Sequence, residues 1–321
     1  MANILILGGG FGALSAAESL LKNLTSERHI TLVSRSPRFV SQPSLVDLAF
    51  GNHTIDDISL DLRDAMHDRR IRFVRGEVAR VDPHERRVTF AHGDITGKMH
   101  YDYLIFALGG RLATERIPGF YEHAHHPLTV EAALKFGEAV QRFDKGRVVI
   151  GYSQGARVVE PVYQTVFAFC RLFEDQLRTG RTQITVVRPT RADDELTGPK
   201  MAKVFQDALD EQKIEVLSDF SINRVTKQSL LTSAGNRIDY DLLMLLPPLV
   251  GPSAVRGMGI TDPDGFIRVN KNMRVDGIAG LYAVGDFCQL SRTKNELYGS
   301  VAGRGCRRPR RRRGRVAGIP T

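Results

Sequence analysis

The chain has 321 residues, of which 42% are hydrophobic and none is tryptophan, enough for two domains with cores of their own. The formal net charge is +9, which in general favours polyanionic partners. Residues 292–321, however, hold ten of the 45 Lys and Arg residues and only one of the 36 acids. The rest of the chain is therefore neutral, and we expect no specific nucleic-acid partner.

No apolar run reaches the ~20 residues that a transmembrane helix needs, and no signal peptide is expected before the first strand. The three cysteines cannot build a disulfide framework and form no CxxC pair, which fits a reducing compartment. The cluster of His123, His125 and His126 lacks cysteine or carboxylate support. We expect these histidines to be solvated, and we expect no metal site.

The first third of the chain alternates strand and helix signals. The apolar run NILILGGG meets a glycine cluster, and the spacing of Leu14 and Ala17 then predicts a helix. ITLVSRS (30–36) predicts a second strand, and RIRFVRGEVARVDPHERRVTF (70–90) predicts a small antiparallel insertion around a Pro-containing turn. YDYLIFALGG (101–110) predicts a buried strand that runs into glycines.

A second alternation begins with a strand and a glycine turn in GRVVIGYSQGA (146–156). A helix is predicted over PVYQTVFAFCRLFEDQLR (161–178), a strand over TQITVVRP (182–189) and another helix over KMAKVFQDALDEQK (200–213). YDLLMLLPPLVG (240–251) predicts a closing strand with a Pro-Pro stop.

The order of these signals predicts an α/β protein with two Rossmann-like, three-layer dinucleotide-binding domains. The first domain is expected to be discontinuous, because the strand signal LYAVGD (281–286) returns after the second alternation has closed. We place the first domain at residues 1–109 and 246–291, the second at 110–245, and a basic tail at 292–321.

The glycine cluster fits the dinucleotide fingerprint G-x-G-x-x-G/A through Gly8, Gly10 and Ala13, directly after a strand and before a helix. Gly8 permits the tight turn, Gly10 lets the backbone approach a pyrophosphate, and Ala13 allows close helix–strand packing. The helix N-terminus adds N–H donors and a partial positive charge. The sequence therefore predicts a dinucleotide site here; the alternative is a purely structural glycine turn.

The fingerprint places an acid at the end of the second strand, where it holds ribose hydroxyls, and this chain has Ser34 and Arg35 there. Ser34 can still bond a hydroxyl, more weakly than a carboxylate does. Arg35 indicates either a contact with the ribose, the adenine or a 2′-phosphate, or an exposed loop arginine.

Two later motifs carry a family resemblance: GLYAVGD (280–286), a strand that ends in Gly-Asp, and ALGG (107–110), which follows a buried strand. In these motifs the chain resembles the FAD-dependent pyridine nucleotide-disulfide oxidoreductase superfamily, whose ATG motif corresponds to ALGG. The resemblance implies FAD as cofactor, with Asp286 at a helix N-terminus holding the flavin ribityl chain. The alternative for Asp286 is a simple helix N-cap.

Within that superfamily the chain resembles sulfide:quinone oxidoreductases, with type II NADH dehydrogenases as the sister branch. ITLVSRSPRFVSQPS resembles the pattern ITLIS…YFQFxPS, which puts Pro43 near the flavin; GYSQGARVVEPVYQ resembles GAAQGASCFGPAYE, and LLMLLPPLVG resembles MIIPPFRG. The residues expected to bind FAD are Gly8, Gly10, Phe11, Gly12, Ala13, Ser34, Arg35, Pro43, Val78, Ala107, Gly109, Gly285 and Asp286.

The resemblance implies an enzyme that passes two electrons from a small donor through flavin to a quinone-like acceptor. It implies a cytoplasmic protein, or one held peripherally on the inner face of the membrane. The expected thiol pair is missing, since its positions fall on Val158 and Leu128. Cys170 is expected in the core, and Cys288 either packs as a small residue or approaches the flavin. No catalytic acid, base or nucleophile can be named.

Two alternatives stay open. The first is a quinone-reducing NAD(P)H dehydrogenase, although Gly151 and Gly155 stand where GGGxxGxE is needed and Arg188 ends the next strand without an acid. The second domain would then be a nucleotide fold that no longer binds nucleotide. The second alternative is a truncated, non-catalytic flavoprotein.

The basic tail is interpreted as a shifted reading frame. In the resembled families the Gly-Asp segment continues into a helix of the type GPKMGxMAxRQAxVAA. Codons can be chosen for residues 292–309 so that dropping the first base gives GPKMSFMAVWQAEVAAA. We therefore hypothesise a frameshift near Ser291 and Arg292, the alternative being a genuine basic arm. Resequencing the gene across this point tests the hypothesis, and a confirmed frame whose tail is needed for activity would contradict it.

Overall fold

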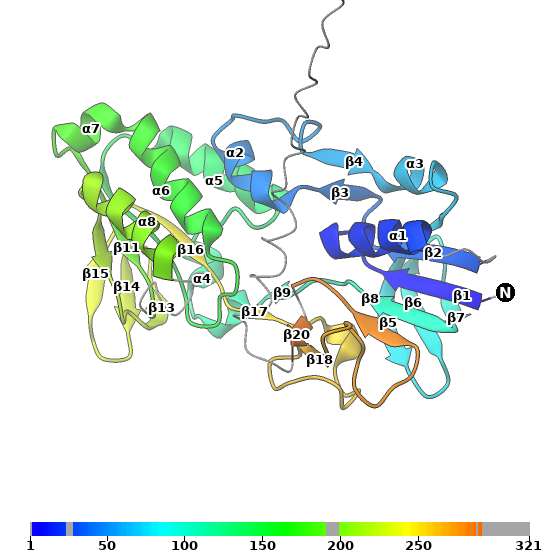
Figure 1. Ribbon diagram of the computed structural model, residues 1–321. Coiled ribbons are helices and arrows are strands. Elements are labelled where there is room, and N and C mark those ends of the chain that lie inside the picture. Colours follow the sequence, from blue (N-terminus) through cyan, green and yellow to red (C-terminus); the bar gives the residue numbers. More distant parts are fainter. Residues whose placement is uncertain (1, 24–27, 191–198, 287, 291–321) are drawn as a thin grey trace, which may run out of the picture.

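The computed structural model describes residues 2–23, 28–190, 199–286 and 288–290. Figure 1 shows two α/β units lying side by side, with short strands between them. Each unit contains a parallel sheet with helices packed against it, so the expected fold class is confirmed. Among the helices in these ranges, none is long and apolar enough to cross a bilayer.

The first unit is built on a seven-stranded sheet. Its elements are β1 (Ala2–Leu7), α1 (Phe11–Asn23), β2 (Arg28–Ser34), α3 (Leu62–His67), β5 (Arg72–Asp82), β6 (Arg87–Gly93), β7 (Gly97–His100), β8 (Tyr103–Phe106) and β19 (Leu281–Ala283). The strand order is β19-β8-β1-β2-β5-β6-β7, and the first five strands are parallel. β1 is apolar on both faces: Leu5 and Leu7 pack into one hydrophobic cluster, Ile4 and Ile6 into another. Such two-sided burial is typical of a parallel sheet.

The antiparallel insertion grows out of the main sheet and is not separate from it. Residues 72–75 of β5 pair in parallel with β2, and the later residues of the same strand pair antiparallel with β6. The register shifts on either side of Val78 mark bulges, which let one strand serve both ladders. The prediction located the hairpin correctly but missed its continuity with the parallel sheet.

The second unit is built on four parallel strands in the order β12-β11-β10-β16. Its elements are α4 (Phe120–His123), α5 (Val130–Arg142), β10 (Gly146–Tyr152), α6 (Glu160–Leu172), α7 (Glu174–Arg178), β11 (Thr182–Val187), α8 (Pro199–Glu211), β12 (Glu215–Leu217), β13 (Ile222–Val225), β14 (Ser229–Thr232), β15 (Arg237–Asp239) and β16 (Leu242–Leu246). β13, β14 and β15 form a separate antiparallel sheet.

The single helix predicted over residues 161–178 is wrong in one respect, because the structure divides it at Phe173 into α6 and α7. The Phe173 ring stacks on Phe169 with centroids 5.3 Å apart and meets the Phe143 ring edge-on at 5.5 Å. Phe173 is buried in this aromatic cluster. Packing of the ring into the core therefore bends the chain where helical periodicity alone would continue.

A segment of the first unit crosses over to the second. It comprises β3 (Arg38–Val40), the 3₁₀ helix η1 (Gln42–Ser44), α2 (Leu45–Ala49) and β4 (Ser59–Asp61). Leu45 and Leu48 are buried in the same hydrophobic cluster as residues of α5 and α6. The Phe50 ring lies edge-on to Phe169, with centroids 5.4 Å apart. This crossing segment, residues 38–61, joins the two units through a shared core that the sequence pattern does not reveal.

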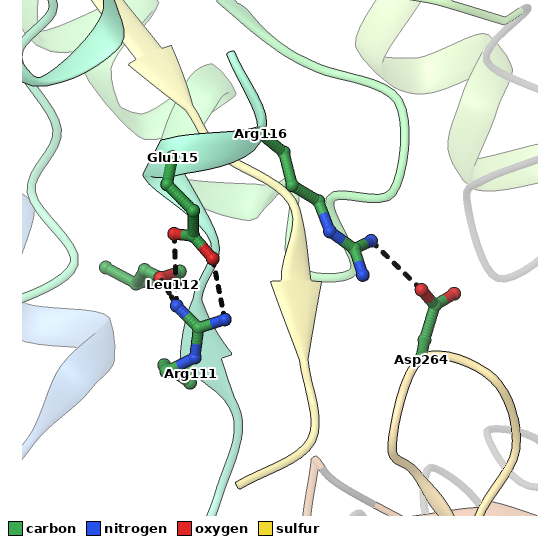
Figure 2. A network of polar contacts seen from close by, with 5 residues as sticks. All are labelled: Arg111, Leu112, Glu115, Arg116 and Asp264. Carbon is green, nitrogen blue, oxygen red and sulfur yellow. Dashed lines mark hydrogen bonds and ion pairs between the residues drawn. The ribbon is translucent and has the colours of Figure 1, made fainter. Parts of the chain in front are cut away.

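Short elements complete the joint between the units. They are β9 (Arg111–Leu112), η2 (Thr114–Arg116), β17 (Leu249–Val250), η4 (Ser253–Val255), β18 (Ile267–Val269) and β20 (Cys288–Leu290). β9 pairs antiparallel with β17, and β18 pairs in parallel with β20. Figure 2 shows Arg111 held by both carboxylate oxygens of Glu115, while Arg116 reaches Asp264 at 3.0 Å. Residues 148 positions apart in the chain are thus tied together at this joint.

Candidate functional site

The glycine turn between β1 and α1 is shaped by close backbone contacts. Gly8 has a φ of +123°, and a Cβ there would lie 2.0 Å from the Ala107 carbonyl oxygen. Only glycine therefore fits at this position. Its amide donates to the Val33 carbonyl at 2.8 Å, which fixes the turn against the end of β2. At Gly10, by contrast, a Cβ would find no described atom within 4 Å, so this part of the turn is open to a ligand.

The Gly-Asp motif near residue 285 lies against the same turn. A Cβ on Gly12 would stand 3.3 Å from the Cα of Gly285, which itself adopts a φ of +90°. The ends of the three strands hold this arrangement: the Val284 amide donates to the Phe106 carbonyl at 2.8 Å, and the Ala107 amide donates to the Leu7 carbonyl at 2.7 Å. Motifs at the two ends of the described chain therefore meet at the carboxyl ends of β1, β8 and β19.

The glycine turn, residues 8–13, and the Gly285-Asp286 turn together form a cradle, and helix α1 begins within it. The Gly10 carbonyl accepts from the Leu14 amide at 3.1 Å, and the described helix has no acid in its first turn. Free N–H donors and the positive end of the helix dipole suit a phosphate or pyrophosphate. Ala13 is fully buried against the sheet, as the fingerprint predicts.

Phe11, next to Gly10 in the glycine turn, has 52% of its surface exposed. Its ring lies edge-on to Phe39 of the crossing segment, with centroids 4.9 Å apart and planes at 90°. The aromatic pair places an apolar wall beside the open glycine turn. Phe11 is thus a large hydrophobic residue of the fingerprint that is not buried in the core.

Ser34 and Arg35, at the end of β2, differ in exposure. Ser34 is buried, and a Cβ on Gly9 would lie 2.5 Å from its hydroxyl oxygen, so serine and glycine turn are in contact. Arg35 is exposed. The roles of Ser34 and Arg35 in ligand binding stay predictions.

The other predicted cofactor ligands lie in three different elements. Gly109 lies in the loop after β8 with a φ of +68° and no described atom near its missing Cβ. Pro43 is exposed in η1 of the crossing segment. Val78 lies opposite Phe90 in the β5–β6 ladder, and its side chain packs against a hydrophobic cluster. The roles of Pro43, Val78 and Gly109 stay predictions.

Asp286 does not begin a helix in the described residues, which corrects the arrangement that the resemblance implied. It lies in a turn, and the chain continues into β20, because residues 288–290 add to β18 as a parallel strand. Its side chain is exposed at the surface, yet the surrounding protein removes enough water to raise the pKa of the carboxyl. The negative charge of Glu160, from the second unit, raises it further.

The described cysteines offer no activated thiol. Cys170 is buried in the core as predicted, and burial raises its pKa. Cys288 is half-buried; burial first, and then the neighbouring charge of Asp286, raise its pKa to about 12. A thiol with so high a pKa stays protonated at neutral pH and is a poor nucleophile. Val158 and Leu128 stand at the two positions where the resemblance places cysteine, so the described residues supply no thiol pair there.

The histidine cluster is partly buried, so the expectation of solvated side chains is wrong. His125 pairs through its backbone with Leu243 and Leu245, which draws the loop onto the edge of the second sheet. The His126 ring packs 6.0 Å from Phe120, and burial lowers its pKa to about 4. Burial also lowers the pKa of His125. Within the described ranges, no group of three or more His, Cys, Asp or Glu residues could hold a metal ion.

Sequence reasoning missed Glu160 and Arg157. Both lie in the stretch from the glycine turn that follows β10 to the start of α6. Glu160 opens α6, and its carboxylate accepts the Val159 amide at 3.1 Å. The guanidinium carbon of Arg157 lies 3.5 Å above the centre of the Phe266 ring. The acid directly before Pro161 is a sequence signal for a self-capped helix start. The contact of Arg157 with residue 266 has no such signal.

Two parallel-sheet units, the first with a glycine turn between its opening strand and helix, define the two-Rossmann class of α/β proteins. The family described as pyridine nucleotide-disulphide oxidoreductase matches residues 2–302. The chain belongs to this family. The match ends inside the basic tail; the proposed frameshift point, near Ser291 and Arg292, lies outside the described residues and stays a prediction.

Individual relatives are similar at a modest level. The sulfide-quinone reductase of Aquifex aeolicus (strain VF5) is 25% identical over 297 residues, which cover 88% of this chain and 67% of that protein. The X-ray structure of the Aquifex aeolicus sulfide:quinone oxidoreductase shares the fold, with a TM-score of 0.82 at 23% identity over 90% of this chain and 69% of that one. The alternative NAD(P)H-ubiquinone oxidoreductase C1 of Arabidopsis thaliana is 30% identical over 155 residues, 44% of this chain and 30% of that protein. The chain thus spans about two thirds of the length of the Aquifex relative.

Proposed function

We propose that the chain is an FAD-dependent oxidoreductase that passes two electrons from a small donor through flavin to a quinone-like acceptor. One observation carries the proposal: the glycine turn at residues 8–13 and the Gly285-Asp286 turn meet at the end of a parallel sheet. They lie so close that a Cβ on Gly12 would stand 3.3 Å from the Gly285 Cα. The names of the similar proteins, which include quinone-reducing oxidoreductases, support the choice of chemistry.

The residues present fit FAD. Gly8 and Gly12 allow backbones to approach closely, Gly10 is open, and the N-terminus of α1 offers donors for a pyrophosphate. Asp286 directly follows Gly285, which lies against Gly12, and its carboxylate would accept from ribityl hydroxyls. When bound, FAD supplies the two-electron chemistry, while the protein orients the cofactor and sets its electrostatic surroundings.

The acceptor, the location and the domain division are part of the same proposal. Acceptor reduction would take place with the protein in the cytoplasm or held peripherally on the inner face of the membrane, in its intact form. The domains would comprise residues 1–109 with 246–291, and 110–245. The return of β19 to the first sheet supports this division, while the crossing segment packs against the second unit.

A quinone-reducing NAD(P)H dehydrogenase is the second candidate. The 30% identity with the NAD(P)H-ubiquinone oxidoreductase segment favours it, and so does the parallel, nucleotide-type sheet of the second unit. A truncated, non-catalytic flavoprotein is the other alternative. It would be supported if the purified protein contained flavin that none of the donors reduces.

An anaerobic reduction experiment separates the candidates. The purified chain is expected to carry a yellow chromophore with the flavin absorbance bands. NADH, NADPH and sulfide are added in turn without oxygen, and bleaching of the flavin band identifies the donor. A soluble quinone analogue should then restore the band. Purified protein that neither contains nor takes up flavin would contradict the proposal, and the same measurements on a frame-corrected chain test the tail.

A further inference from the structure

The second unit has a glycine turn like that of the first, but its helix begins with an acid. Glu160 is the first residue of α6, a 13-residue helix, and its carboxylate accepts the Val159 amide at 3.1 Å. In Rossmann domains the pyrophosphate of a dinucleotide binds at this helix N-terminus. The protein's own carboxylate thus stands where the ligand's negative charge would come.

Two further positions at this helix end offer no free donor to a ligand. Pro161 has no N–H, and the Val162 amide donates to the Val159 carbonyl at 3.0 Å. The turn itself is held from the joint side, because the Leu249 amide donates to the Gly155 carbonyl at 3.0 Å. The helix that opens the first unit, α1, has no acid in its described first turn. The two glycine turns therefore present opposite charge.

The place for the adenosine ribose is changed as well. Nucleotide domains hold an acid at the end of the second strand, and this chain has Arg188 after β11. Arg188 is only 7% exposed and turns inward: its Nε donates to the Ser218 hydroxyl at 2.9 Å, and a terminal nitrogen donates to Gln206 at 3.4 Å. Its hydrogen bonds are made within the protein, and it offers no acceptor to a ribose hydroxyl.

We infer that Glu160 is a specificity-determining residue, whose carboxylate excludes the pyrophosphate of nicotinamide dinucleotides from the second unit. The electron donor is then not NADH or NADPH, and this conclusion about the donor rests on the proposed flavin-dependent function. The charge of Glu160 also contributes to the raised pKa of the Asp286 carboxyl in the first unit.

The test compares two variants with a matched control. Glu160→Gln removes the charge at nearly constant shape, and Glu160→Gly also removes the side chain. Glu131→Gln makes the same change in the first turn of α5, another exposed acid on a 13-residue helix of the same unit. NADH and NADPH are titrated into each purified protein by calorimetry at low salt. We expect wild type and Glu131→Gln to behave alike, and both Glu160 variants to bind at least about tenfold more tightly.

Three outcomes would overturn the inference. One is equal affinity of wild type and Glu160→Gly, including the case in which neither binds. Another is a matching gain in Glu131→Gln, which would point to net charge alone. The third is wild type that binds NADH as tightly as the variants and is reduced by it. Circular dichroism of each variant verifies that α6 is retained.

The same titration distinguishes the two proposals, because calorimetry does not need a reducible flavin. A protein that never binds flavin but gains dinucleotide affinity in the Glu160 variants contradicts the proposed function and supports the role of Glu160. A flavoprotein whose dinucleotide affinity is insensitive to Glu160 does the reverse.

Discussion

At the scale of single residues, the glycines of one turn face different surroundings. Gly8 has a backbone conformation that side chains disfavour, and its missing Cβ would strike the Ala107 carbonyl. Gly10, two residues later, has no described atom near its missing Cβ. The first glycine is therefore required by the fold, whereas the second is required only if a ligand's phosphate comes close to the backbone.

This contrast gives a paired prediction. Gly8→Ala should lower the free energy of unfolding of the flavin-free protein by about 1–3 kcal/mol, from backbone strain and the clash. Gly10→Ala should leave that stability within about 0.5 kcal/mol, as for a site with free space, yet lower the flavin content of the purified protein. Urea unfolding and the ratio of flavin to protein absorbance measure the two effects. Full flavin content in Gly10→Ala would contradict a pyrophosphate at this turn.

His126 allows a prediction for the pH dependence of stability. Burial lowers its pKa from 6.5 to about 4 in the folded chain, so the unfolded chain binds more protons between these values. The contribution is fully present above pH 6.5 and is lost as the pH falls toward 4. From the folded and unfolded pKa values we expect a loss of about 2 kcal/mol between pH 7 and pH 5.

His126→Asn removes this titration and keeps an acceptor for the Leu128 amide, which donates to the His126 Nδ1 at 3.3 Å. Urea unfolding at the two pH values should therefore show a flatter pH dependence in the variant than in wild type. His84→Asn, a change at an exposed histidine, is the control. Parallel pH curves for wild type and His126→Asn would contradict the prediction.

At the scale of secondary-structure elements, helix α2 has an importance beyond its five residues. It belongs by sequence to the first unit but lies on α5 of the second. The contact is so close that a Cβ on Gly137 would stand 2.4 Å from the Ala49 carbonyl oxygen. Helices approach this closely only where one of them presents a small residue. The pair of helices thus sets how the crossing segment, and with it Phe39 and Pro43, is held beside the cradle.

Gly137→Ala tests this helix contact. The added methyl group has no space, so α2 and α5 must separate, and we expect a destabilisation of about 1–3 kcal/mol. Leu134→Ala, a change at an exposed position of the same helix, should cost much less. Urea unfolding measures both variants. A Gly137→Ala protein as stable as Leu134→Ala would contradict the close packing of the two helices.

At the scale of the whole molecule, two arginines tie the units to one turn, residues 262–266. Arg157 stacks on Phe266 and approaches Asp262 at 4.0 Å, with side chains only 22% and 11% exposed. Arg116 pairs with Asp264 at 3.0 Å, with both side chains about half exposed (Figure 2). Burial lowers the pKa of Arg157, while the two aspartates act in the opposite direction.

The two arginines should differ in how much each contributes to the free energy of unfolding. Arg157→Met loses a desolvated cation–π contact and leaves the mostly buried Asp262 carboxylate without its ion-pair partner, so we expect a cost of about 1–3 kcal/mol. Arg116→Met removes an exposed ion pair, which is worth about 0–1 kcal/mol at moderate salt. Thermal and urea unfolding of both variants measure the difference. An equal or larger effect at Arg116 would show that the turn is held mainly at the surface.

Local sequence patterns were sufficient for several features. The strand–glycine–helix order predicts the cradle because a tight turn before a helix needs residues of defined size at Gly8 and Ala13. Apolar periodicity predicts the two parallel-sheet units and the burial of Cys170. These features depend on neighbours in the chain, so a linear pattern contains the necessary information. The fingerprint also predicts where a pyrophosphate would bind, whereas Asp286 was expected at a helix start and lies in a turn before β20.

Only the tertiary structure decided what depends on residues far apart in the chain. The packing of α2 on α5, the stacking of Arg157 on Phe266 and the burial of His126 arise from surfaces that meet after folding. The role inferred for Glu160 depends on the fold in the same way, because an exposed acid at a helix start excludes a pyrophosphate only where the helix follows a glycine turn. Sequence patterns fix local conformation through short-range sterics and hydrogen bonds, whereas desolvation and charge at a joint exist only once the two units are in contact.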